Sequence, residues 1–98
     1  MKKQLFIASL CHRGMLGGDL TADGNALTYR TAKLTVAREL RHLEMKYADI
    51  LAVTKDKAGV FPAVNIHMKN GKDYKFVVFL ARKRLMDLVK SHGVNVIS

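Results

Sequence analysis

Hydrophobic and polar residues alternate along most of this chain, with the period of two that is typical of strands packed on one face. The clearest example runs from Val64 to Met68. At about 81–92 the period changes to that of an amphipathic helix, whose apolar stripe consists of Ala81, Leu85, Leu88 and Val89. Gly93 is well placed to end that helix. The pattern predicts a mainly β fold with one C-terminal α-helix.

Glycines and turn dipeptides divide the first 80 residues into seven expected strands in hairpin order. Strands are expected at 4–11 and 16–22, after the turn at Asp23–Gly24, at about 43–47, at 50–55, and on both sides of Asn70–Gly71. The stretch 35–43 is expected to be a connecting loop that can hold one helical turn, 48–49 a bend, and 55–59 a polar loop.

The two sharp turns predict strand register. A two-residue turn at Asp23–Gly24 would pair Leu20 with Leu27 and place both on the inner face. A two-residue turn at Asn70–Gly71 would mix core and surface residues.

A three-residue loop at 69–71, with Gly71 in the left-handed conformation, avoids that mixing. It pairs Met68 with Lys72 and Ile66 with Tyr74. We therefore expect this longer loop, with His67 opposite Asp73 on the outer face.

Length and composition add limits to this picture. A chain of 98 residues, of which 49% are hydrophobic and 26% charged, is expected to form a single domain over 1–98, with 94–98 as a C-terminal tail. The short apolar stretch before Cys11 resembles a signal peptide only faintly, because Arg13 follows almost at once. We expect a cytoplasmic protein, in which the lone Cys11 is a small, mostly buried hydrophobe.

Three segments carry a resemblance to a known superfold. They are 18–31 (glycine, strand, turn, aliphatic, aromatic), 45–53 (apolar, aromatic, Asp-Ile, Val) and 66–76 (a polar turn with glycine, then aromatic and phenylalanine). Together they resemble the GRAM-like or bacterial PH-like branch of the pleckstrin-homology superfold, over about residues 14 to 92. The resemblance implies a seven-stranded antiparallel barrel or orthogonal sandwich, capped by the amphipathic helix. Relatives of this type bind phosphoinositides or peptides, but the basic cluster of phosphoinositide binders is poor here, with only Arg13 in the first loop.

Catalytic and metal-binding motifs are absent from the sequence. Cys11 and His12 are neighbours on an expected strand and would point to opposite faces. The four histidines have no ligand spacing, and the glycine-rich stretch 14–18 lacks the Lys-Ser/Thr of a phosphate-binding loop. We expect no enzyme activity, no metal and no cofactor.

The net charge of +9 is the unusual number, and it favours a polyanionic partner. If the barrel forms, three of its loops would gather basic residues at one open end: Arg13, Lys33, Arg38, Arg41, Lys69 and Lys72. That end is the candidate anion- or partner-binding site, although a merely well-charged surface would account for the same residues. A basic nucleic-acid-associated protein is the alternative, which the lack of a basic aromatic stripe disfavours.

A protein partner is also possible from the run 76–80, which has no polar break. Val77 and Phe79 are expected to face outward and to form an interface, including one between two copies of the chain. Cover by the first strand or by 94–97 is the other explanation. The sequence therefore predicts a non-enzymatic binding or adaptor module that recruits a protein partner or an anionic, membrane-like surface.

Overall fold

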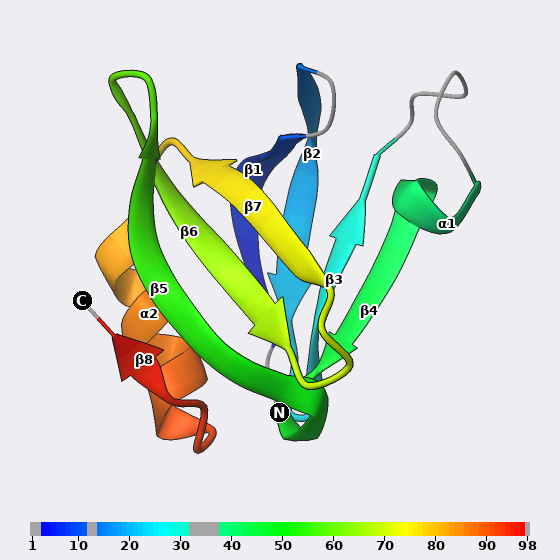
Figure 1. Ribbon diagram of the computed structural model, residues 1–98, viewed down its shortest axis with the longest axis vertical. Helices are drawn as coiled ribbons and strands as arrows, with labels where there is room; N and C mark the ends of the chain where they lie inside the picture. Colours follow the sequence, from blue (N-terminus) through cyan, green and yellow to red (C-terminus); the bar gives the residue numbers. More distant parts are fainter. Residues whose placement is uncertain (1–2, 12–13, 32–37, 98) are drawn as a thin grey trace.

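The computed structural model describes residues 3–11, 14–31 and 38–97 (Figure 1). The described strands are β1 (Gln4–Cys11), β2 (Met15–Ala22), β3 (Ala26–Arg30), β4 (His42–Lys46), β5 (Ile50–Ala58), β6 (Phe61–Met68), β7 (Asp73–Val78) and β8 (Val96–Ile97). The helices described are α1 (Arg38–Arg41), a 3-10 turn η1 (Tyr47–Asp49) and the longer α2 (Arg82–Ser91). A mainly β fold with a C-terminal helix is confirmed.

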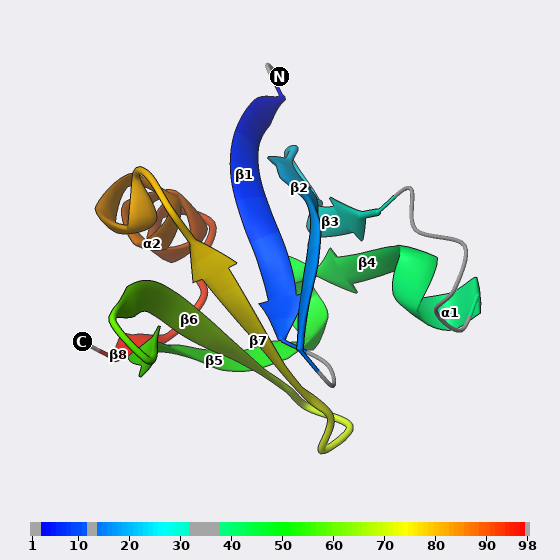
Figure 2. The same cartoon turned by 90° about the horizontal axis from the view of Figure 1, so that it is seen from above.

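The strands form one sheet in the order β4-β3-β2-β1-β7-β6-β5-β8. Neighbours are antiparallel except β8, which pairs in parallel with β5. β4 and β8 are the two edges, so the sheet is not closed. Figure 2 shows the sheet bending between its two halves, with α2 lying between β1 and β5.

The core lies on the inner face of this bent sheet. Its largest fully buried side chains include Tyr29, Phe76 and Leu20, and the apolar side of α2 adds Leu85 and Val89. The helical spacing in the sequence predicted the burial of Leu85 and Val89 correctly. Leu88 is only partly buried, Met86 is buried although it was not expected, and Ala81 is exposed and precedes the helix. Gly93 follows the helix with φ +85°, a left-handed conformation that ends it as expected.

The expected register of the β2–β3 hairpin is wrong by one step of two residues. Leu20 pairs with Tyr29, not with Leu27. The Asp23 carboxylate accepts hydrogen bonds from the backbone N–H of Asn25 and of Ala26, at 2.7 and 2.9 Å. Asp23 therefore stands at the first corner of the turn instead of its centre. A shift of two residues keeps the same faces inward, so Leu20 and Leu27 are buried as expected although they do not pair.

The expected register of the β6–β7 hairpin is confirmed. Ile66 pairs with Tyr74, and the N–H of Met68 donates to the carbonyl of Lys72 at 2.8 Å. Gly71 has φ +92°, as the three-residue loop requires. His67 Nδ1 lies 2.7 Å from a carboxylate oxygen of Asp73.

The expectations for the stretch 55–59 and for the segment 94–98 need correction. The polar stretch 55–59 is not a loop, because β5 continues to Ala58 and pairs there with Phe61. The polar side chains of that stretch alternate on an extended strand, and Gly59 and Val60 alone form the turn. Within 94–98, Val96 pairs with Val53 as part of β8.

Candidate functional site

Lys69 and Lys72 lie at the β6–β7 turn and line one cavity of about 530 Å³ between that turn and β4. The acidic residues Glu44 and Asp49 line the same cavity. Two cations are therefore matched there by two anions, which leaves no net formal charge to attract a polyanion.

The other basic residues expected at this site are not gathered beside those lysines. Arg38 and Arg41 belong to α1, which lies at the upper right in Figure 1, whereas the β6–β7 turn lies at the bottom. Arg13 and Lys33 lie outside the described residues. Among the described residues, the expected basic cluster is split between two ends of the molecule.

The expected outward pair on β7 also divides. Val77 is completely buried, at 0% exposure, although it points to the face opposite the core. Its cross-strand neighbours on that face are Ser9 and Ala63, which are themselves buried. Val77 therefore offers no contact surface, while Phe79 remains 40% exposed.

Four large apolar side chains are exposed together at one end of the sheet, and we call them the apolar tip: Val60, Phe61, Phe79 and Leu80. Val60 belongs to the β5–β6 turn, and Leu80 to the loop between β7 and α2. The rings of Phe61 and Phe79 meet edge to face, with centroids 5.5 Å apart, which holds the two segments together. Val60 and Leu80 are 90% and 76% exposed, so nothing within the described chain covers them.

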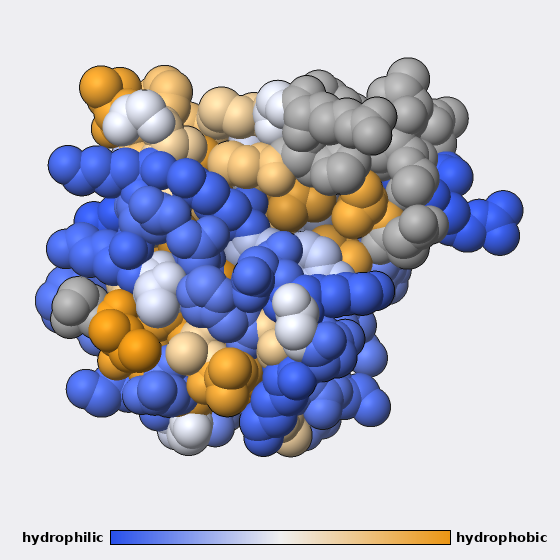
Figure 3. Space-filling view, viewed as in Figure 1, coloured by the Kyte–Doolittle hydropathy of each residue, from blue (hydrophilic) through white to orange (hydrophobic). Residues whose placement is uncertain are grey.

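Basic side chains flank the apolar tip. Lys55 and Lys57 lie on β5 just before the turn, and Arg82, Lys83 and Arg84 form the first turn of α2 just after Leu80. Figure 3 shows apolar atoms at the upper left, over the β5–β6 turn, and hydrophilic atoms over β5 below them. The apolar tip and the basic residues around it make this end of the sheet amphipathic.

The position of the three α2 cations opposes the stability of the helix. The first turn of α2 contains no acidic residue. Cations at a helix N-terminus meet the positive end of its dipole, where each costs on the order of 0.3–1 kcal/mol. The Arg84 guanidinium lies over the ring of Phe6, 4.8 Å from its centroid, and this cation–π contact offsets part of the unfavourable interaction with the helix dipole.

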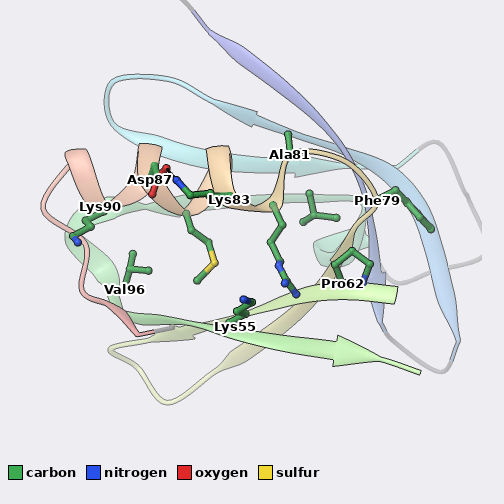
Figure 4. Close-up of a pocket in the computed structure, with 11 residues that line it drawn as sticks. Lys55, Pro62, Phe79, Ala81, Lys83, Asp87, Lys90 and Val96 are labelled. Carbon is green, nitrogen blue, oxygen red and sulfur yellow. Dashed lines mark hydrogen bonds and ion pairs between the residues drawn. The ribbon is translucent and has the colours of Figure 1, made fainter. Parts of the chain in front are cut away.

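A cavity of about 570 Å³ lies beside the apolar tip, between α2 and the strands β5 and β6. Figure 4 shows Phe79 and Pro62 at one end of this cavity, Lys90 and Val96 at the other, and Lys55 on the strand side. Val78 and Met86 are buried and contribute to its apolar wall.

The cations around the cavity differ in how they are engaged. Arg82 donates to the backbone carbonyl of Asp56 at 2.9 Å, which ties α2 to β5. Lys83 lies 3.0 Å from the carboxylate of Asp87. Lys55 and Lys90 have no carboxylate partner within the part of the chain that the structure describes. Those two ammonium groups are free to meet a ligand.

The Asp56 carboxylate is ionised, and its direct ion pair among the described residues is with Lys75 and not with the cations of the cavity. It accepts hydrogen bonds from the backbone N–H of Lys57 and from the side chain of Asn65, and these bonds hold the pKa of Asp56 below its ordinary value. Lys75 lies 3.4 Å from the same carboxylate. Asp56 is thus a charged but fully engaged group.

Sequence reasoning found only Phe79 of this site, as an outward-facing residue of a possible interface. It assigned 55–59 to a loop and saw the basic face of α2 only as the side away from the core. The sequence did contain a local indication of this surface. Val60 and Leu80 are large aliphatic residues at turn positions, with Lys57 two residues before Gly59 and Arg82 two residues after Leu80. Only the pairing of Phe61 with Phe79 shows that the two turns belong to one surface.

The described residues contain no group of three or more His, Cys, Asp or Glu side chains placed to hold a metal ion. None of the described helices is long and apolar enough to cross a membrane. What the described side chains offer is apolar contact and positive charge at one end of the sheet.

Comparisons with known proteins do not name a function. No family model matches the chain, and no curated protein matches it. A crystal structure of the C-terminal domain of an unknown protein from Leishmania infantum has a similar fold, with a TM-score of 0.74. The match covers 91% of this chain and 80% of that one at 18% sequence identity, so the likeness concerns the fold alone.

Proposed function

We propose that this chain is a non-enzymatic binding module that docks on anionic membrane surfaces with its apolar tip. The observation that carries the proposal is the exposure of Val60 and Leu80 on two adjoining turns that basic residues flank. Aliphatic side chains at this end would enter the lipid, and Lys57, Lys83 and Arg84 would meet anionic head groups. A cytoplasmic location is part of the proposal, since the cytoplasmic leaflet carries anionic lipid.

A PH-like scaffold is part of the same proposal. The sheet bends into two halves that meet where β1 pairs with β7, and α2 packs between the two halves (Figure 2). This arrangement supports a barrel- or sandwich-like scaffold of PH type. The resemblance of 18–31, 45–53 and 66–76 to GRAM-like domains supports the same assignment. The docking end itself rests on the exposed side chains of this chain and not on the resemblance.

The apolar tip favours a membrane over a nucleic acid. Basic residues alone would serve either partner, because both are polyanions. Single-stranded nucleic acids stack on exposed aromatic rings along a basic groove. Val60 and Leu80 have no such use, and the rings of Phe61 and Phe79 pack against each other.

Co-sedimentation with vesicles tests the proposal. We expect wild-type protein to bind vesicles of phosphatidylcholine with 30% phosphatidylglycerol, and not phosphatidylcholine alone. Replacing Val60 and Leu80 with serine should weaken binding at least about 30-fold, because each inserted side chain contributes about 1–2 kcal/mol. Both side chains are exposed, so the double variant should fold normally.

The control is Lys69→Gln with Lys72→Gln, two cations removed from the opposite end. This control should bind within about threefold of wild type, since its cations lie far from the bilayer. Binding that survives the serine substitutions but disappears in the lysine control would place the site at the β6–β7 turn and overturn the proposal. Wild-type protein that ignores both vesicles would direct the search to a protein partner for the apolar tip.

A further inference from the structure

The cavity beside the apolar tip combines an apolar wall with a basic rim. Its wall is apolar, with Val78, Met86 and Pro62 from three different elements. Its rim holds four cations, Lys55, Arg82, Lys83 and Lys90, and one anion, Asp87. The formal charge around the opening is therefore four minus one, or +3.

The size and shape of the cavity suit a small ligand. Its volume of about 570 Å³ falls within the range of roughly 300–1,000 Å³ typical of ligand pockets. Those pockets are mostly apolar and contain a few polar groups that fix orientation. Here the orienting groups are ammonium ions, so the ligand must carry negative charge at one end.

We propose that this cavity binds a single-chain anionic amphiphile, with its alkyl chain against Val78, Met86 and Pro62 and its anionic head group at Lys55 and Lys90. Lys55 lies on β5 at the strand side of the cavity and Lys90 on α2 at the end away from Phe79 (Figure 4), and neither has a carboxylate partner in the described chain. Arg82 is anchored to the carbonyl of Asp56 and adds a fixed positive charge nearby. A long-chain carboxylate and an alkyl phosphate both have this chemistry.

The position of the cavity predicts how the ligand is oriented relative to the apolar tip. Phe79 belongs both to the apolar tip and to the cavity wall, so the cavity opens beside the surface that meets the bilayer. The alkyl chain would then point toward the lipid, and the head group would lie at the side of the cavity where Lys55 and Lys90 line it (Figure 4). This orientation rests on the proposed function, whereas binding of a free amphiphile in solution does not.

The test measures binding of dodecyl phosphate, below its critical micelle concentration, by calorimetry and by NMR of the methionine methyl groups. We expect the Met86 methyl signal to shift, assigned by its loss in Met86→Leu. Octyl phosphate should bind more weakly, by about fourfold for each methylene removed, if the chain is buried. Dodecyltrimethylammonium, which has the same chain and the opposite charge, should not bind.

Substitutions then locate the head group. Lys55→Met with Lys90→Met should weaken dodecyl phosphate binding at least tenfold, while keeping the long side chains and the fold. The matched pair Lys69→Met and Lys72→Met removes the same charge at the opposite end and should change the affinity less than threefold. A Met86 signal that does not move, or equal losses in the two pairs, would overturn the proposal.

A second experiment distinguishes binding in the cavity from membrane docking. It also distinguishes an amphiphile free in solution from one that is part of a membrane. The same dodecyl phosphate is offered as a monomer in solution and as a minor component of phosphatidylcholine vesicles. Val60→Ser with Leu80→Ser should weaken binding to the vesicles at least about 30-fold and leave binding of the monomer intact. Wild-type protein that binds phosphatidylglycerol vesicles but no dodecyl phosphate monomer would overturn the cavity proposal and leave the docking function standing.

Discussion

Gly18 lies on β2 at a point where β3 leaves no room for a side chain. A Cβ atom at this position would lie 2.2 Å from the carbonyl oxygen of Arg30 and 2.9 Å from Cε1 of Tyr29. The Tyr29 hydroxyl donates to the carbonyl of Leu16 at 2.6 Å, so the ring cannot move away freely. The neighbouring Gly17 faces open space.

Gly18→Ala should therefore lower the free energy of unfolding by about 3 kcal/mol, because backbone atoms would have to separate. Gly17→Ala is the matched control, and we expect a change within about 0.5 kcal/mol. Urea unfolding of both variants measures the difference. Equal stability of the two would show that β2 and β3 are farther apart than described.

Tyr47 links three segments through one ring. Its hydroxyl donates to the carbonyl of Asp23 at 2.7 Å, and its ring stacks on His92 with centroids 4.4 Å apart. Burial raises the pKa of Tyr47 to about 12, and the nearby Asp23 carboxylate acts in the same direction.

This raised pKa predicts a pH dependence of stability. In the unfolded chain Tyr47 ionises near pH 10, whereas in the folded chain it stays neutral to about pH 12. Its contribution to stability is thus fully present below pH 10 and is lost between pH 10 and about 12. The stability difference between wild type and Tyr47→Phe, measured by urea unfolding, should shrink over that interval. A difference that stays constant would contradict the assignment.

At the scale of elements, the two hairpins show what local sequence can decide. The register at Asn70–Gly71 was predictable because alternation on both strands allowed only one loop length to keep the apolar residues together. The same criterion failed at Asp23–Gly24, because two registers that differ by two residues bury the same faces. The register there is decided by the Asp23 carboxylate, which accepts two backbone hydrogen bonds within the turn.

Long-range contacts explain why the rest was not predictable. β8 is two residues long, and it exists because Val96 meets the edge of β5. The buried state of Val77 depends on neighbours from β1 and β6, so an outward position did not mean an exposed one. The gathering of the apolar tip likewise depends on the pairing of β6 with β7.

α2 provides a prediction that separates stability from binding. Lys83→Gln with Arg84→Gln removes two cations from the positive end of the helix dipole, which is favourable. It also removes the ion pair with Asp87 and the contact over Phe6, which is unfavourable. We expect these effects to cancel to within about 1 kcal/mol in thermal unfolding.

Binding of the same variant to phosphatidylglycerol vesicles should fall about 30-fold, since each basic residue near an anionic surface contributes about 1 kcal/mol. A large loss of stability with unchanged vesicle binding would assign these two residues to the fold instead of the membrane.

At the scale of the whole molecule, charge and apolar exposure are distributed unevenly. The chain carries a net charge of +9, yet the lysines at the β6–β7 turn share their cavity with two acidic residues. The cations beside the apolar tip outnumber the acids there, and Lys55 is unpaired among the described residues. The molecule therefore has one end where exposed apolar side chains lie beside cations that are unpaired among the described residues, and another where lysines and acidic residues are balanced. Figure 1 shows the β5–β6 and β6–β7 turns at opposite ends.

The most direct test of this polarity is the depth at which each end meets a bilayer. The single native cysteine is first removed as Cys11→Ser, and an environment-sensitive dye is then attached through Val60→Cys or, in the control, Asn70→Cys. With phosphatidylglycerol vesicles, dye at position 60 should shift to the blue and become inaccessible to an aqueous quencher, while dye at position 70 should not change. A blue shift at position 70 with none at position 60 would contradict the account.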